Sequence, residues 1–147
     1  NALFRRLVFN ILVSNHDDHA RNHGLVMRDE GFRLSPAFDV VAGEGMRRHQ
    51  AIAVGAEGAQ ATLSNALSQC QRFFLQKDMA SQIIEEVIET VSDWKEVFSH
   101  CGVPEREIDD LAWAMLPDTA LDGPWASMRL RRTSAGDVND PGADFSP

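Results

Sequence analysis

The stretch Asn15-His16-Asp17-Asp18-His19-Ala20-Arg21-Asn22-His23 decides how this sequence is interpreted. It follows a run of apolar residues at helical spacing, which predicts a helix over residues 2–14: Leu3, Phe4, Leu7, Val8, Ile11 and Leu12. Polar residues held between two regular elements are typical of functional loops, although a solvated connector is the simpler alternative. The stretch is therefore the first place to look for chemistry.

A β-hairpin is predicted directly after this stretch. Residues 24–28 and 32–34 are compatible with strands and flank the turn residues Asp29-Glu30-Gly31. A loop with one short strand, around residues 51–54, is expected between the hairpin and the next helix. Three further helices are predicted: 62–70, 79–101 and 104–115. The pattern indicates a mainly α protein of the α+β class, with one small β-hairpin.

Length and composition predict one domain followed by a tail. The chain has 147 residues, of which 44% are hydrophobic and 24% charged, as in ordinary globular proteins. Residues 1–116 carry the apolar patterning, whereas residues 117–147 are rich in proline and glycine and read as an arm or tail anchored by Trp125. The longest apolar run, residues 7–15, is too short to span a bilayer, so no membrane partner is expected.

Charge and cysteine usage exclude some functions. Residues 1–50 carry a net charge of +1 and residues 51–147 a net charge of −9, which disfavours non-specific binding to nucleic acid. Cys70 and Cys101 show no metal-binding spacing and are expected to be buried free thiols in a reducing compartment. Trp94, Phe98 and Trp113 follow helical spacing and are expected to pack in the core or against another lobe.

The spacing of three side chains matches the needs of phosphoryl transfer. Asp17 and Asn22 are five residues apart, and Asp39 follows after the predicted hairpin. Phosphoryl transfer requires a carboxylate that accepts the proton of the attacking hydroxyl, and oxygen ligands for Mg²⁺. Protein kinases present these groups in the same order, as helix, catalytic loop, hairpin and metal-binding aspartate.

Residues 15–22, together with Gly31-Phe32-Arg33-Leu34-Ser35-Pro36-Ala37-Phe38-Asp39, resemble the C-terminal kinase lobe of HipA-type proteins. These are serine/threonine kinases of bacterial toxin–antitoxin pairs. The resemblance covers about residues 2–116. Arg21 stands where the family usually has lysine, and Phe38 where it often has tyrosine. The exchange of lysine for arginine is not neutral at a position that grips a phosphate.

The resemblance implies a role for each matched residue. Asp17 would be the catalytic proton acceptor, and Asn22 and Asp39 would hold Mg²⁺. His19 and Arg21 would lie beside the ATP phosphates and Phe38 beside the nucleotide. Asp18 falls at a variable position and receives no role.

The resemblance also implies partners and a cellular setting. A protein substrate, a helix-turn-helix antitoxin, DNA contact only through the antitoxin complex, and a cytoplasmic location would follow. The chain begins inside the helix that precedes the catalytic loop, so it is expected to be a fragment that is inactive alone.

Three alternatives remain open. His16, His19 and His23 could bind zinc if they lay on one helix face. The dipeptide His16-Asp17 is also found in metal-dependent phosphohydrolases of the HD type, which need another histidine upstream. Finally, the chain could be a non-catalytic interaction or transcription-regulatory module of a HipA-like repressor complex.

Overall fold

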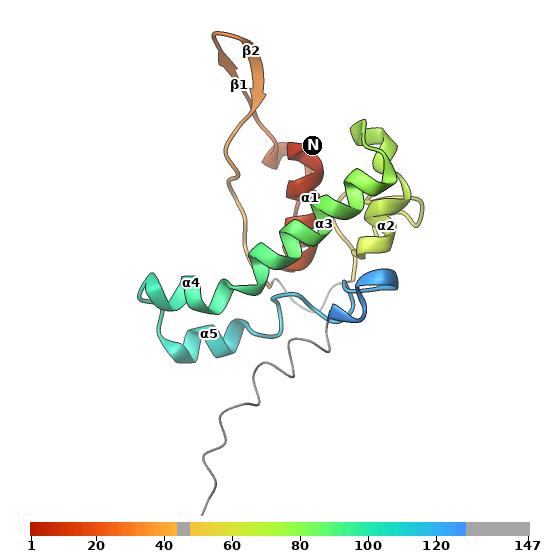
Figure 1. The fold of residues 1–147 in the computed structure, drawn as a ribbon. Helices are drawn as coiled ribbons and strands as arrows, with labels where there is room; N and C mark the ends of the chain where they lie inside the picture. Colours follow the sequence, from red (N-terminus) through yellow and green to blue (C-terminus); the bar gives the residue numbers. More distant parts are fainter. Residues whose placement is uncertain (44–47, 129–147) are drawn as a thin grey trace, which may run out of the picture.

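The computed structural model describes residues 1–43 and 48–128. It is helix-rich, with one small antiparallel sheet in the described part (Figure 1). The helices are α1 (Ala2–Leu12), α2 (Leu63–Ser68), α3 (Lys77–Ser92), α4 (Trp94–His100) and α5 (Glu105–Leu111). Short 3₁₀ turns are η1 (Ala20–Asn22), η2 (Cys70–Phe73) and η3 (Gly123–Trp125). The expected α+β class is confirmed.

The core forms where α1 packs against α3. The apolar stripe of α1 buries Phe4, Leu7, Val8, Ile11 and Leu12, and α3 contributes Ile83, Ile84, Val87, Ile88 and Val91. An ion pair between Arg5 of α1 and Glu86 of α3 lies at the edge of this contact. The helical spacing of apolar residues in the sequence therefore predicted the buried faces of α1 and α3 correctly.

The predicted hairpin is confirmed. Strands β1 (Leu25–Arg28) and β2 (Gly31–Leu34) pair in antiparallel register, with Leu25 opposite Leu34 and Met27 opposite Phe32. Gly31 has a φ of +112°, which other residues rarely adopt, and closes the turn. The hairpin projects away from the helices, as Figure 1 shows.

The prediction of one long helix over residues 79–101 is wrong. This segment is divided at Asp93 into α3 and α4. The Ser92 hydroxyl donates to the Ile88 carbonyl at 2.8 Å, a bond that competes with the helical backbone and bends helices. Beyond the break, Trp94 is buried and lies edge-on to Phe98. Gly102 follows α4 with a φ of +80°, as expected of a helix terminator.

Other element boundaries also differ from the prediction. The first helix ends at Leu12, the helix expected over residues 62–70 is α2 followed by η2, and the last helix ends at Leu111. No strand forms at residues 51–54. Instead, described residues of that loop form isolated bridges between His49 and Gln60 and between Gly55 and Gly58.

The segment after α5 returns to the main core. Ala120, Leu121 and Trp125 are buried in the same cluster as α1, and Leu116 donates a backbone hydrogen bond to Leu12 at 2.6 Å. The part of the predicted tail beyond residue 128 lies outside the described residues.

Three expectations about single side chains have mixed outcomes. Cys70 is buried, but Cys101 is exposed at the end of α4, which corrects the prediction that both thiols are buried. Trp113 is 49% exposed and is not a core residue, because α5 ends before it.

In the described ranges, no helix combines the length and apolar character needed to cross a membrane.

Candidate functional site

Residues 15–23, here called the polar loop, are fixed where α1 ends. Ser14 adopts a left-handed backbone with a φ of 53°, and its hydroxyl donates to the Ala114 carbonyl at 2.7 Å. The buried Asn15 then bonds back to Asn10, from backbone nitrogen to carbonyl at 2.9 Å and from amide to amide at 3.2 Å. These bonds set the direction in which the loop leaves the helix.

The candidate metal ligand Asn22 is held by the loop itself. Its backbone nitrogen donates to the His19 carbonyl at 2.9 Å within η1. Its side-chain Nδ2 donates to the Asp17 carbonyl at 3.3 Å, and the residue is only 5% exposed. Because Nδ2 is engaged, Oδ1 is the atom of this amide that remains suited to a cation.

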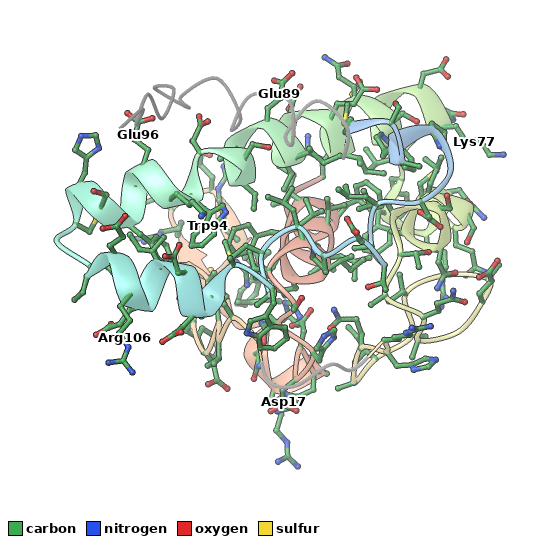
Figure 2. The ribbon with its side chains drawn as sticks, turned by 90° about the horizontal axis from the view of Figure 1, so that it is seen from below. Asp17, Lys77, Glu89, Trp94, Glu96 and Arg106 are labelled. Atoms are coloured by element: carbon green, nitrogen blue, oxygen red, sulfur yellow. The ribbon has the colours of Figure 1, made fainter. Side chains whose placement is uncertain are left out.

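The remaining loop candidates differ in exposure. Asp17 is exposed, and Figure 2 shows it at the periphery of the molecule, whereas Trp94 lies inside. His19 is half-buried and Arg21 is exposed. The predicted proton acceptor is therefore open to an incoming molecule, while its neighbour Asn22 is enclosed.

The structure assigns Asp18 a contact that the sequence did not suggest. Asp18 is 2% exposed, and its Oδ1 lies 2.9 Å from Nε2 of His23. The contact is short but is not a directed hydrogen bond, and it would be an ion pair when His23 is protonated. No helix or strand periodicity links residues five apart, so the sequence carried no signal for this pair.

Asp39 lies in the segment that follows the hairpin. It is exposed and has a φ of 56°, a backbone conformation that aspartate and asparagine tolerate better than most residues. Positive φ at a non-glycine residue is a form of local strain often found at functional sites.

This segment touches the end of the polar loop. Ser35 donates its backbone N–H to the Gly24 carbonyl at 2.8 Å, and Arg6 of α1 donates to the Ser35 carbonyl at 2.6 Å. A Cβ added at Gly24 would lie 3.2 Å from Oγ of Ser35 and 3.7 Å from Cε1 of Phe38, so both side chains lie next to Gly24. The structure therefore brings the neighbourhoods of Asn22 and Asp39 together. The approach of those two side chains to each other stays a prediction.

Residues 50 and 51 lie against the start of the polar loop. Ala51 donates its backbone N–H to the His16 carbonyl at 2.9 Å, and the adjacent Gln50 bonds through its backbone to Ala59 at 2.8 Å. Both side-chain polar atoms of Gln50 are buried without a hydrogen bond to the described residues.

A hollow of about 650 Å³ opens beside His16. Its wall includes Arg48, Thr62, Trp113 and Asp118. The half-exposed Trp113 thus lines a space that also borders His16, the residue before Asp17, and helical spacing did not indicate this.

The zinc alternative finds no support in the described ranges. No three histidine, cysteine, aspartate or glutamate side chains gather there as metal ligands. His16 is buried, whereas His23 is paired with Asp18.

Comparison with protein families identifies the chain. A model described as the HipA-like C-terminal domain matches residues 1–95, which includes the polar loop, the hairpin and Asp39. The chain belongs to this family. The HipA-type resemblance read from the sequence is confirmed for a C-terminal portion. No curated protein matches the chain. The HipA-like match extends from α1 through α3 and ends at the beginning of α4.

Proposed function

We propose that this chain is the C-terminal catalytic lobe of a HipA-like serine/threonine protein kinase. The observation that carries the proposal is the junction of the polar loop with the segment leading to Asp39. Asn22 is oriented by the Asp17 carbonyl, and Phe38 packs toward Gly24, two residues beyond Asn22. Membership in the HipA-like family supports the same conclusion.

The side chains present fit Mg²⁺ and the phosphates of ATP. Asn22 would offer Oδ1 and Asp39 its carboxylate, and oxygen atoms of these kinds are the protein ligands that Mg²⁺ prefers. When bound with ATP, the metal would neutralise negative charge on the phosphates. His19 and Arg21 would lie beside those phosphates and Phe38 beside the nucleotide.

Asp17 serves as the proton acceptor in this proposal. The hydroxyl oxygen of a protein serine or threonine attacks the γ-phosphorus, and the bond from that phosphorus to the leaving ADP oxygen breaks. The hydroxyl proton passes to the Asp17 carboxylate. The exposure of Asp17 supports this role, because the acceptor hydroxyl must reach the carboxylate from outside.

The hollow beside His16 suits the polypeptide that carries the acceptor hydroxyl. Its wall combines the half-exposed ring of Trp113 with charged side chains such as Arg48. Exposed aromatic and arginine side chains are the residue types that most often anchor protein partners. We place the protein substrate on this side of the loop.

The wider biological setting follows from the family resemblance alone. We propose a toxin of a bacterial toxin–antitoxin system, acting in the cytoplasm with a helix-turn-helix antitoxin. Contact with DNA would occur only through the antitoxin complex. The lobe would need the remainder of the kinase for catalysis, since it supplies only part of a nucleotide site.

Two isosteric variants of the complete protein test the proposal. Asp17→Asn removes the proton acceptor, so phosphotransfer should fall at least about 100-fold while Mg²⁺–ATP binding persists. Asp39→Asn preserves tolerance of the positive φ but weakens a metal ligand, so both binding and transfer should decline. Asp29→Asn, which alters an exposed carboxylate at the hairpin turn, is the matched control.

The measurements are transfer of labelled γ-phosphate to protein and calorimetric titration with Mg²⁺–ATP. Full transfer by Asp17→Asn would assign the base to another residue. Absence of transfer by the wild-type protein, with its folded state intact, would favour the non-catalytic module instead.

A further inference from the structure

The Asp18 carboxylate is buried in a part of the loop that the proposed chemistry does not use. Asp18 is 2% exposed although its neighbour Asp17 is exposed. Aspartate is almost never buried to this extent unless it has a partner. The position therefore needs a structural or functional reason.

The partner is the imidazole of His23, at the other end of the loop. Oδ1 of Asp18 lies 2.9 Å from Nε2 of His23, and their side chains are 3% and 14% exposed. The approach is close, but Nε2 makes no directed hydrogen bond to the carboxylate. The second ring nitrogen, Nδ1, is buried and makes no hydrogen bond to the described residues. Asp18 is thus the polar group that holds this ring.

The surroundings of the pair are apolar. Asp18 and His23 lie in the wall of a cavity of about 400 Å³, whose other lining includes Leu3, Leu7 and Phe73. In such a setting a carboxylate and a protonated imidazole would attract strongly, but removing them from water would cost about as much. A buried pair of this kind contributes little net stability and can instead specify one geometry.

The pair encloses the residues that the proposed site needs. Between Asp18 and His23 lie His19, Arg21 and Asn22, and Asp17 immediately precedes the pair. Other bonds across the loop include the two made by Asn22 and a longer backbone contact from His23 to Ala20, at 3.4 Å. The ion pair is the contact that joins the two ends of this span through side chains.

We propose that Asp18 and His23 are positioning residues, whose ion pair holds the polar loop so that Asp17 and Asn22 keep their relative placement. The effect on catalysis rests on the proposed kinase function. The effect on the structure of the polar loop does not rest on that function, because it concerns only the contact between Asp18 and His23.

Three variants of the complete protein test the pair: Asp18→Leu, His23→Leu and the double variant. Each single change removes one member of the pair, leaves the other buried polar side chain without a partner, and should make the polar loop more mobile. Misplacement of catalytic groups by about 1 Å can cost about 100-fold in rate, so kcat should fall about 10- to 100-fold. KM for ATP should rise as well, because Asn22 moves with the loop. In the double variant, apolar packing replaces the pair and should restore a large part of both constants.

A readout independent of catalysis is backbone amide exchange. In each single variant, the amides of Asn22 and His23 should exchange at least about tenfold faster than in the wild-type protein. The double variant should return them toward the wild-type rate. Glu30→Gln, which removes the exposed ion pair with Arg33 on the hairpin, is the control and should change neither readout.

The possible outcomes separate the two proposals. Exchange that accelerates in the single variants and recovers in the double variant supports the positioning role, even if the wild-type protein transfers no phosphate. Unchanged exchange, or single effects that merely add in the double variant, would overturn it. A fall in unfolding stability with kcat and KM unchanged would likewise reduce the pair to a structural contact. If a leucine variant fails to fold, Asp18→Asn keeps the shape of the side chain but removes the carboxylate. Faster exchange of the Asn22 amide in that variant would support the positioning role, and exchange at the wild-type rate would overturn it.

Discussion

The side-chain Nδ2 of Asn22 donates a hydrogen bond to the backbone carbonyl of Asp17, 3.3 Å away. This bond joins the residue proposed to accept a proton to the residue proposed to hold a metal. It also orients the amide, because the nitrogen faces the protein and the oxygen is left for a ligand. The relationship explains why an asparagine suits this position better than an aspartate.

Replacing Asn22 by aspartate should destabilise the protein. Asn22→Asp removes the donor and sets a carboxylate oxygen against the Asp17 carbonyl in a site that is 5% exposed. We expect the free energy of unfolding to fall by about 1–3 kcal/mol, as for a buried group that loses its partner. Urea denaturation monitored by tryptophan fluorescence measures the change. Gln71→Glu, the same chemical change at an exposed residue, should have an effect within about 0.5 kcal/mol.

Two tryptophans beyond α5 should respond very differently to truncation. Trp125 is 2% exposed within the main core, so Trp125→Ala should lower the free energy of unfolding by about 3–5 kcal/mol. Trp113 is 49% exposed, so Trp113→Ala should cost about 1 kcal/mol or less. Equal losses of stability in denaturant titrations would contradict the placement of residues 120–125 in the core.

A pair of glycines in the loop after the hairpin provides a steric test. A Cβ added at Gly55 would lie 1.8 Å from the Asn65 carbonyl oxygen, a backbone atom that cannot move aside cheaply. Gly55→Ala should therefore cost about 3 kcal/mol or more in unfolding free energy. Gly58 has open space but a φ of +64°, so Gly58→Ala should cost only the conformational strain, about 1–2 kcal/mol. Thermal melting of both variants would show whether the order is reversed.

The isolated chain should bind nucleotide weakly. Of the residues proposed to contact ATP, it supplies His19, Arg21, Asn22, Phe38 and Asp39, and the proposal assigns the opposite wall of the site to the remainder of the kinase. Calorimetric titration with Mg²⁺–ATP should give a dissociation constant of about 1 mM or weaker, equivalent to about −4 kcal/mol. Micromolar binding with turnover would show that this chain forms a complete site by itself.

The sequence was informative where one element decides its own structure. The apolar stripe that begins at Leu3 determined α1, and Asp29-Glu30-Gly31 determined the hairpin, because both signals are local. The division at Asp93 was missed because the apolar spacing continues across it while the Ser92 hydroxyl competes for the backbone. The exposure of Trp113 was missed because it depends on where α5 ends.

The candidate site shows the same limit. The spacing of Asp17, Asn22 and Asp39 in the sequence indicated a phosphoryl-transfer pattern, which stays a prediction, and all three residues lie within the family match. The burial of Asp18 against His23 could not be foreseen, because it depends on a cavity formed with residues from α1, the hairpin and η2. Long-range packing of this kind leaves no periodic signal in the sequence.

The measurement that tests the central claim most directly is an experimental structure of the complete protein with Mg²⁺ and a non-hydrolysable ATP analogue. We predict that Asn22 Oδ1 and a carboxylate oxygen of Asp39 both lie about 2.0–2.1 Å from one metal ion. The Asp17 carboxylate should stand beside the γ-phosphate without being a required ligand. A metal–nucleotide complex bound elsewhere, or Asn22 and Asp39 facing different sites, would contradict the proposed kinase site.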